Sequence, residues 1–317
     1  SLMNQHQRPQ FEEYNRGLQA QLREQHAVRK ERPILSYEAA RQNRLTLDWT
    51  TEAPATPAFT GRRVIDVPLT DLVPFIDWTF FFTAWELKGR FPAILNHPEY
   101  GTAARELYDN AQTLLDRIIR EQLLTARGVY GFWPAASEGD DIIVFADDHR
   151  TGELLRFNML RQQEIIADAR PNLSLADFIA DRTAPVQDYI GAFAVTAGLG
   201  ADELAHRFEA ERDDYNAILV KALADRFAEA FAAYLHARSR AEWGILEQTS
   251  PDDLLHEKHR GIRPAFGYPA CPDHSEKFKL FDLLQAGEIG ISLTEHAAMS
   301  PAASVSGMYF AHPQAKY

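Results

Sequence analysis

The sequence lacks the residues that several common kinds of site require. Its 317 residues include a single cysteine, Cys271, which excludes an internal disulfide and a multi-cysteine zinc or iron–sulfur centre. It contains no glycine-rich dinucleotide or phosphate-binding pattern. No apolar run approaches the ~18–20 residues needed to cross a bilayer, and the first ten residues lack the apolar core of a signal peptide. We therefore expect a soluble, cytoplasmic protein with no membrane partner.

Positive charge is also scarce. The 33 Lys and Arg residues face 45 Asp and Glu residues, which gives a formal net charge of −12. Because phosphate binding needs a basic surface, we expect no nucleic-acid partner. The remaining composition, 45% hydrophobic and 11% aromatic, is typical of a globular protein that is long enough to bury a sizeable core.

Helical patterns occur in both halves of the chain. Residues 11–32 favour a polar helix with sparse apolar positions, and Ser36 begins a second short helix, so we predict linker helices within residues 1–48. Apolar residues recurring at intervals of three and four predict an amphipathic helix over 102–127 that Gly128 can close. The same periodicity predicts one long helix over 201–243, ended by Gly244.

Strand patterns lie between these two helices. Residues 128–133, 141–146 and 154–160 read as strands, and the turn-forming residues 148–152 join the last two into an antiparallel hairpin. Residues 189–196 form a further buried strand. Helices that flank an antiparallel hairpin, without regular βαβ alternation, predict an α+β fold.

The most distinctive segment is RGIRPAFGYPACPDHSEK at residues 260–277. Its three prolines and two glycines predict a stiff, irregular loop. Arg263 offers a planar fork for a carboxylate, Tyr268 a π-face and a hydroxyl, and His274 a titratable imidazole. A ligand site and a plain structural loop remain equally open. Cys271 and His274 have the spacing of half a zinc site, but no second pair of ligands accompanies them and we expect no metal.

Three acidic residues leave two interpretations open. Asp225 and Glu229 stand four apart and share a helix face, which is either a solvated acidic stripe or a wall facing a cationic sulfonium or ammonium. Asp77 lies among the aromatic residues of FIDWTFFF. It either caps the helix that follows or faces a cleft and binds a donor there.

Taken together, several long segments carry a family resemblance. They are QHAVRKERPILSYEAARQNRLTLDW, FIDWTFFFTAWEL, DDYNAILVKALADRFAEAFAAYLH, RPAFGYPACPDHSEK and SLTEHAAMSPAASVSGMYFAHPQAKY. In this order they resemble the S-adenosylmethionine-binding activation domain of cobalamin-dependent methionine synthase. The resemblance implies a single C-shaped α+β domain over residues 49–317, with a bent antiparallel sheet flanked by helices, after the linker helices of 1–48.

The resemblance also implies an activity. Domains of this family present the methyl group of S-adenosylmethionine for the reductive methylation of cob(II)alamin, with an electron from flavodoxin or a related flavoprotein reductase. The chain would thus act in methionine biosynthesis as part of a methyltransferase. Its sequence lacks the Asp-x-His-x-x-Gly pattern of a cobalamin module, so we expect a separate cobalamin-binding domain of the same enzyme to hold that cofactor.

Site residues are carried over by position in the matching segments. Asp77 is expected to hold the amino group of the ligand and Arg263 its carboxylate. The resemblance implies no catalytic residue in this chain, because the nucleophile is the metal of the cofactor. Further ligand contacts are implied for Ala265, Tyr268, Tyr317, Glu229, Glu257 and His274, and a contact with the cobalamin module for Asp225.

We consider two other functions. The chain could be a non-catalytic module that senses S-adenosylmethionine or docks flavodoxin. A self-contained methyltransferase is less well supported, because the expected glycine motif is absent. Ser1 and Leu2 precede Met3, and we expect the chain to be a piece of a longer protein.

Overall fold

The computed structural model describes residues 8–28, 34–165, 170–245, 247, 250, 253 and 258–317. The chain divides into two compact units, Ser1–Arg44 with Gln162–Asn172, and Leu45–Arg161 with Leu173–Tyr317. All the site residues proposed from the sequence belong to the second unit. No described helix is long and apolar enough to cross a membrane.

The first unit contains the two helices expected near the start of the chain. α1 (Arg8–Val28) agrees with the predicted helix as far as residue 28, and the rest of that prediction lies outside the described residues. α2 (Tyr37–Gln42) begins at Ser36, whose hydroxyl accepts a hydrogen bond from the Ala39 N–H at 3.2 Å. Asn43 Nδ2 donates to Asn172 Oδ1 at 2.8 Å and so joins the two segments of this unit.

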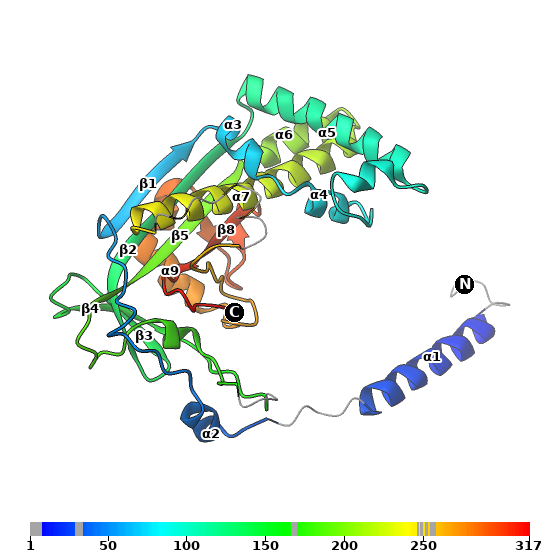
Figure 1. Ribbon diagram of the computed structural model, residues 1–317. Coiled ribbons are helices and arrows are strands. Elements are labelled where there is room, and N and C mark those ends of the chain that lie inside the picture. The colour runs from blue at the N-terminus through cyan, green and yellow to red at the C-terminus, as the bar shows by residue number, and fades with distance from the viewer. Residues whose placement is uncertain are drawn as a thin grey trace. The chain divides into compact units, whose positions relative to one another are not determined.

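An antiparallel sheet of six strands runs through the described part of the second unit (Figure 1). The strand order is β4-β3-β2-β5-β8, and β1 also pairs with β2. β5 follows one edge of β2, whereas β1 and β3 share the other edge. The strands are β1 (Gly61–Val67), β2 (Thr125–Glu138), β3 (Asp141–Phe145), β4 (Glu153–Asn158), β5 (Asp188–Leu199) and β8 (Ser304–Tyr309), and β6 (Ser292–Leu293) with β7 (Met299–Ser300) forms a separate pair.

Both faces of this sheet are buried. Phe193 and Val195 of β5 pack in one hydrophobic core, and Ala192 and Ala194 pack in a second core on the other face. This double burial explains why residues 189–196 are almost all apolar. The first core includes α3 (Leu69–Leu72), η1 (Val73–Phe75), α4 (Trp78–Ala84), η2 (Ala93–Asn96), α5 (Gly101–Glu121), α6 (Ala201–Ala210) and α7 (Asp214–Glu242), and the second includes η4 (Leu175–Phe178), α9 (Glu276–Leu284) and η5 (Ala286–Ile289).

The predicted α+β class is confirmed, but two helix predictions need correction. The long helix is two helices, because α6 ends at Ala210 and Arg212 has a left-handed φ of 63°. Asp213 then caps α7 by accepting the Asn216 N–H at 3.0 Å. The amphipathic helix α5 ends at Glu121 instead of Arg127, and the residues from Thr125 onward pair in β2.

A buried ionic cluster fixes the start of the hairpin. The Arg161 side chain is 0% exposed, and its guanidinium donates two hydrogen bonds of 2.8 Å to the carboxylate of Asp177. It also donates to Asp140, with Nε 3.0 Å from Oδ1. Asp177 accepts the Ser174 N–H at 3.0 Å as part of the capping box of η4. Arg161 therefore neutralises two buried carboxylates from separate segments.

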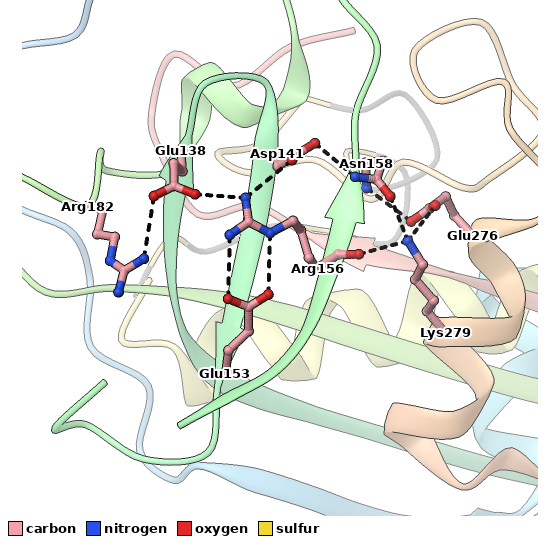
Figure 2. A network of polar contacts seen from close by, with 8 residues as sticks. All are labelled: Glu138, Asp141, Glu153, Arg156, Asn158, Arg182, Glu276 and Lys279. Atoms are coloured by element: carbon pink, nitrogen blue, oxygen red, sulfur yellow. Dashed lines mark hydrogen bonds and ion pairs between the residues drawn. The ribbon is translucent and has the colours of Figure 1, made fainter. Parts of the chain in front are cut away.

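A second polar network fastens α9 to the hairpin (Figure 2). Glu276 accepts the backbone N–H of Asn158 at 3.1 Å. Lys279 donates to the backbone carbonyl of Arg156 and to Asn158 Oδ1, both at 2.8 Å, and to Glu276 at 2.7 Å. These contacts hold the first turn of α9 against β4.

Candidate functional site

The proline-rich loop is irregular, as predicted, and it lies along the edge strand β8. Ile262 and Phe310 exchange two backbone hydrogen bonds of 3.1 Å, and the Met308 N–H donates to the Pro264 carbonyl at 2.9 Å. A Cβ at Gly307 would lie 2.6 Å from the Pro264 oxygen, so only glycine allows this approach. The edge of the sheet thereby sets the position of Arg263.

A tight turn follows and closes on Cys271. The Gly267 N–H donates to the Cys271 carbonyl at 2.9 Å, and the Cys271 thiol donates to the Ala265 carbonyl at 3.0 Å. Gly267 has a φ of +98°, a conformation that other residues rarely adopt. The carbonyl of Ala265, one of the expected ligand contacts, is thus engaged by the loop itself.

Arg263 and Tyr317 meet although 54 positions separate them. The Arg263 N–H donates to the Tyr317 hydroxyl at 3.2 Å. Tyr317 and Tyr268 are 56% and 66% exposed. Core packing does not explain such exposure of two aromatic side chains.

The guanidinium of Arg263 is a half-buried cation without an ion-pair partner among the described residues. Arg240, by contrast, pairs with Glu247 at 2.6 Å. Burial, together with the positive charges of Arg263, His259 and Arg240, lowers the pKa of His236 well below its usual value. An uncompensated cation beside a neutral imidazole is a favourable position for a carboxylate.

Asp77 caps α4, and only one of its oxygens does so. Oδ1 accepts the N–H groups of Thr79 at 2.8 Å and Phe80 at 3.4 Å. No described residue donates to Oδ2, and the side chain is half-buried. Asp77 is therefore a helix cap, which is the first of the two interpretations. Its second oxygen can still accept a hydrogen bond from a ligand, as the second interpretation requires.

Both regions pack on α7. Phe75 contacts Tyr234 edge-to-face, with ring centroids 5.6 Å apart, just before Asp77. Two residues further along α7, the ring of His236 lies against Gly261, where an added Cβ would be 3.9 Å from its Nε2. Since the helix rises about 1.5 Å per residue, neighbouring parts of α7 support both the Asp77 cap and the loop of Arg263.

Two of the remaining acidic residues lie on α7. Asp225 and Glu229 are both exposed on this helix. Partial loss of hydration raises the pKa of Asp225, the charge of Glu229 adds to this effect, and Arg226 opposes it. Arg226 itself lies 6.0 Å over the Phe80 ring of α4. Glu257 lies outside the described residues.

Contacts around His274 were not predicted from the sequence. Its ring lies against Gly267, where an added Cβ would be 2.1 Å from Cε1. Lys277 Nζ lies 3.2 Å from His274 Nδ1. The sequence signal for these contacts was weak: glycine, histidine and lysine occur together in one irregular segment. In the described ranges no three His, Cys, Asp or Glu side chains gather as metal ligands.

Comparison with known proteins identifies the family. A family model described as "Vitamin B12 dependent methionine synthase, activation domain" matches residues 68–317. The chain belongs to this family. It is also similar to the chain in "Crystal Structure of the MetH Reactivation Domain bound to AdoHcy", with 46% sequence identity and a TM-score of 0.87 over 90% of this chain and 89% of that one. Methionine synthases are methyltransferases, so this activation domain is part of a methyltransferase.

Proposed function

We propose that this activation domain binds S-adenosylmethionine and presents its methyl group to cobalamin held by a separate domain of the same enzyme. The observation that carries the proposal is the half-buried guanidinium of Arg263, which forms no ion pair with a described residue. The backbone N–H of Arg263 contacts the hydroxyl of the exposed Tyr317, and the exposed Tyr268 follows in the same loop. The similar MetH structure is described as bound to AdoHcy, which is this ligand without the transferred methyl group.

The residues present fit such a ligand. Arg263 would bind its carboxylate, and the unused oxygen of Asp77 would accept from its ammonium group. Tyr268 and Tyr317 would cover the adenine ring. We further propose that Glu229 and Glu257 place negative charge near the sulfonium, and that Asp225 contacts the cobalamin domain.

Positioning is the main contribution that these residues would make. Cobalamin bound in its own domain would supply the metal that accepts the methyl group, and flavodoxin or a related flavoprotein would supply the electron. Arg263 and Asp77 would hold the two ends of the amino-acid moiety and fix the direction of the methyl group. No side chain of this domain needs to act as a general base in that arrangement.

Calorimetry and a transfer assay test the proposal. The chain should bind S-adenosylmethionine in a one-to-one complex. With isolated cobalamin-binding domain, reduced flavodoxin and methyl-labelled S-adenosylmethionine, it should also produce labelled methylcobalamin. Absence of binding would contradict the proposal. Binding without transfer would favour the sensing or docking module instead.

Replacing Asp77 with asparagine separates its two roles. Asparagine caps helices as well as aspartate does, so the free energy of unfolding should change by less than about 0.5 kcal/mol. Affinity for S-adenosylmethionine should fall about tenfold, because the amide nitrogen cannot accept from the ammonium group. Calorimetry and urea unfolding measure the two effects. If Asp77→Asn bound S-adenosylmethionine with the affinity of the unchanged chain, Asp77 would not be a ligand contact.

A further inference from the structure

Lys277 is a buried amine with unusual partners. It is 8% exposed on the first turn of α9, and its Nζ lies 3.2 Å from His274 Nδ1 and 3.2 Å from the Ala297 carbonyl. Among the described residues no carboxylate pairs with it. Burial lowers the pKa of Lys277. A buried amine held only by neutral acceptors is costly, so its contacts require an explanation.

The surroundings of Lys277 are rigid. Its neighbours Glu276 and Lys279 fasten the first turn of α9 to β4 (Figure 2). Ala297, the second acceptor, has a left-handed φ of 58° inside a turn closed by the Thr294–Ala298 backbone hydrogen bond of 2.8 Å. The amine is therefore presented to His274 from a fixed direction.

This contact determines the chemistry of the imidazole. A Lys277 ammonium can only donate, and an imidazole that accepts this hydrogen bond at Nδ1 carries its ring proton on Nε2. The ring is also seated against Gly267, in the loop that carries Arg263. No described residue is hydrogen-bonded to His274 Nε2, which is thus an available donor at the loop.

We infer that Lys277 is a positioning residue that holds His274 in its Nε2–H tautomer, so that His274 donates a hydrogen bond to an acceptor atom of the bound ligand. The ligand part of this inference rests on the proposed binding of S-adenosylmethionine. The tautomer part depends on the protein alone.

Two-dimensional ¹⁵N–¹H spectra of the imidazoles test the tautomer without ligand. The His274 signals, assigned by their loss in His274→Gln, should show the Nε2–H tautomer. Lys277→Met should convert them to a mixture of tautomers. Lys221→Met is the matched control, since Lys221 is an exposed lysine on α7 that pairs with Glu209. An Nδ1–H tautomer in the unchanged chain, or no change in Lys277→Met, would overturn the inference.

Affinities test the positioning role. Lys277→Met should weaken S-adenosylmethionine binding about three- to tenfold, as expected for one neutral hydrogen bond. His274→Gln places an amide donor near the position of Nε2 and should bind nearly normally, whereas His274→Ala should not. In the His274→Gln background, Lys277→Met should have no further effect. A full additional loss there would show a purely structural role for Lys277, and unchanged binding by Lys277→Met alone would also contradict the inference.

Failure of the proposed function would look different. If the unchanged chain bound no S-adenosylmethionine, the proposed function would fail while the tautomer spectra still decided the Lys277–His274 contact. Near-ultraviolet circular dichroism of each variant shows whether it retains the native fold, so that a misfolded variant is recognised.

Discussion

Replacing Arg263 with alanine should weaken S-adenosylmethionine binding about 10- to 150-fold. The change removes a charge-assisted hydrogen bond to the ligand carboxylate, worth roughly 1.5–3 kcal/mol. The guanidinium forms no ion pair with a described residue, so its removal leaves no protein carboxylate stranded. The loss should therefore appear in affinity, as measured by calorimetry, with little change in stability.

A ligand without the amino-acid moiety provides the internal control. 5′-Methylthioadenosine lacks both the carboxylate and the ammonium group, so Arg263→Ala should leave its affinity unchanged. Arg62→Ala serves as the matched protein variant, because Arg62 forms a surface ion pair with Glu288 at 2.7 Å. Equal losses for the two ligands would show that Arg263 shapes the loop and does not bind the carboxylate.

The largest loss of stability is expected for Arg161→Met. The change leaves the buried carboxylates of Asp140 and Asp177 without their counter-ion, which costs about 3–5 kcal/mol when one partner of a buried pair is removed. The midpoint of urea unfolding, followed by circular dichroism, should fall accordingly.

Arg156→Met is the matched comparison. Arg156 also contacts several carboxylates, including Glu138 at 2.8 Å, but its side chain is 29% exposed. Water can solvate the acids that remain, so the cost should be about 1 kcal/mol. A similar midpoint for the two variants would mean that burial does not set the strength of the Arg161 cluster.

Local signals predicted much of the fold, and long-range pairing accounts for most of what they missed. The Ser36 cap and the buried strand near residues 189–196 were correct, because each depends on neighbouring residues or on a continuous apolar run. β1 and β8 were missed, since their short sequences acquire their strand structure by pairing with β2 and β5. The interruption at Arg212 was hidden by an apolar period that continues from α6 into α7.

In the candidate site, too, local features were predicted from the sequence and long-range contacts were not. Proline and glycine content predicted an irregular loop, and the aromatic surroundings of Asp77 allowed for a helix cap. The contact of Arg263 with Tyr317 and the seat of His274 on Gly267 depend on tertiary structure, which no local pattern encodes. The ligand contacts expected at Asp77, Arg263 and the tyrosines came from the family resemblance and remain predictions.

The reactivity of the Cys271 thiol can report how often the proline-rich loop opens. Burial raises its pKa to about 12, and its proton is donated to the Ala265 carbonyl. Alkylating reagents attack the thiolate, so iodoacetamide should modify the closed loop very slowly. Because the chain has one cysteine, the rate of its alkylation measures how often the turn at Gly267 opens, and a bound ligand that clamps this turn will slow the reaction.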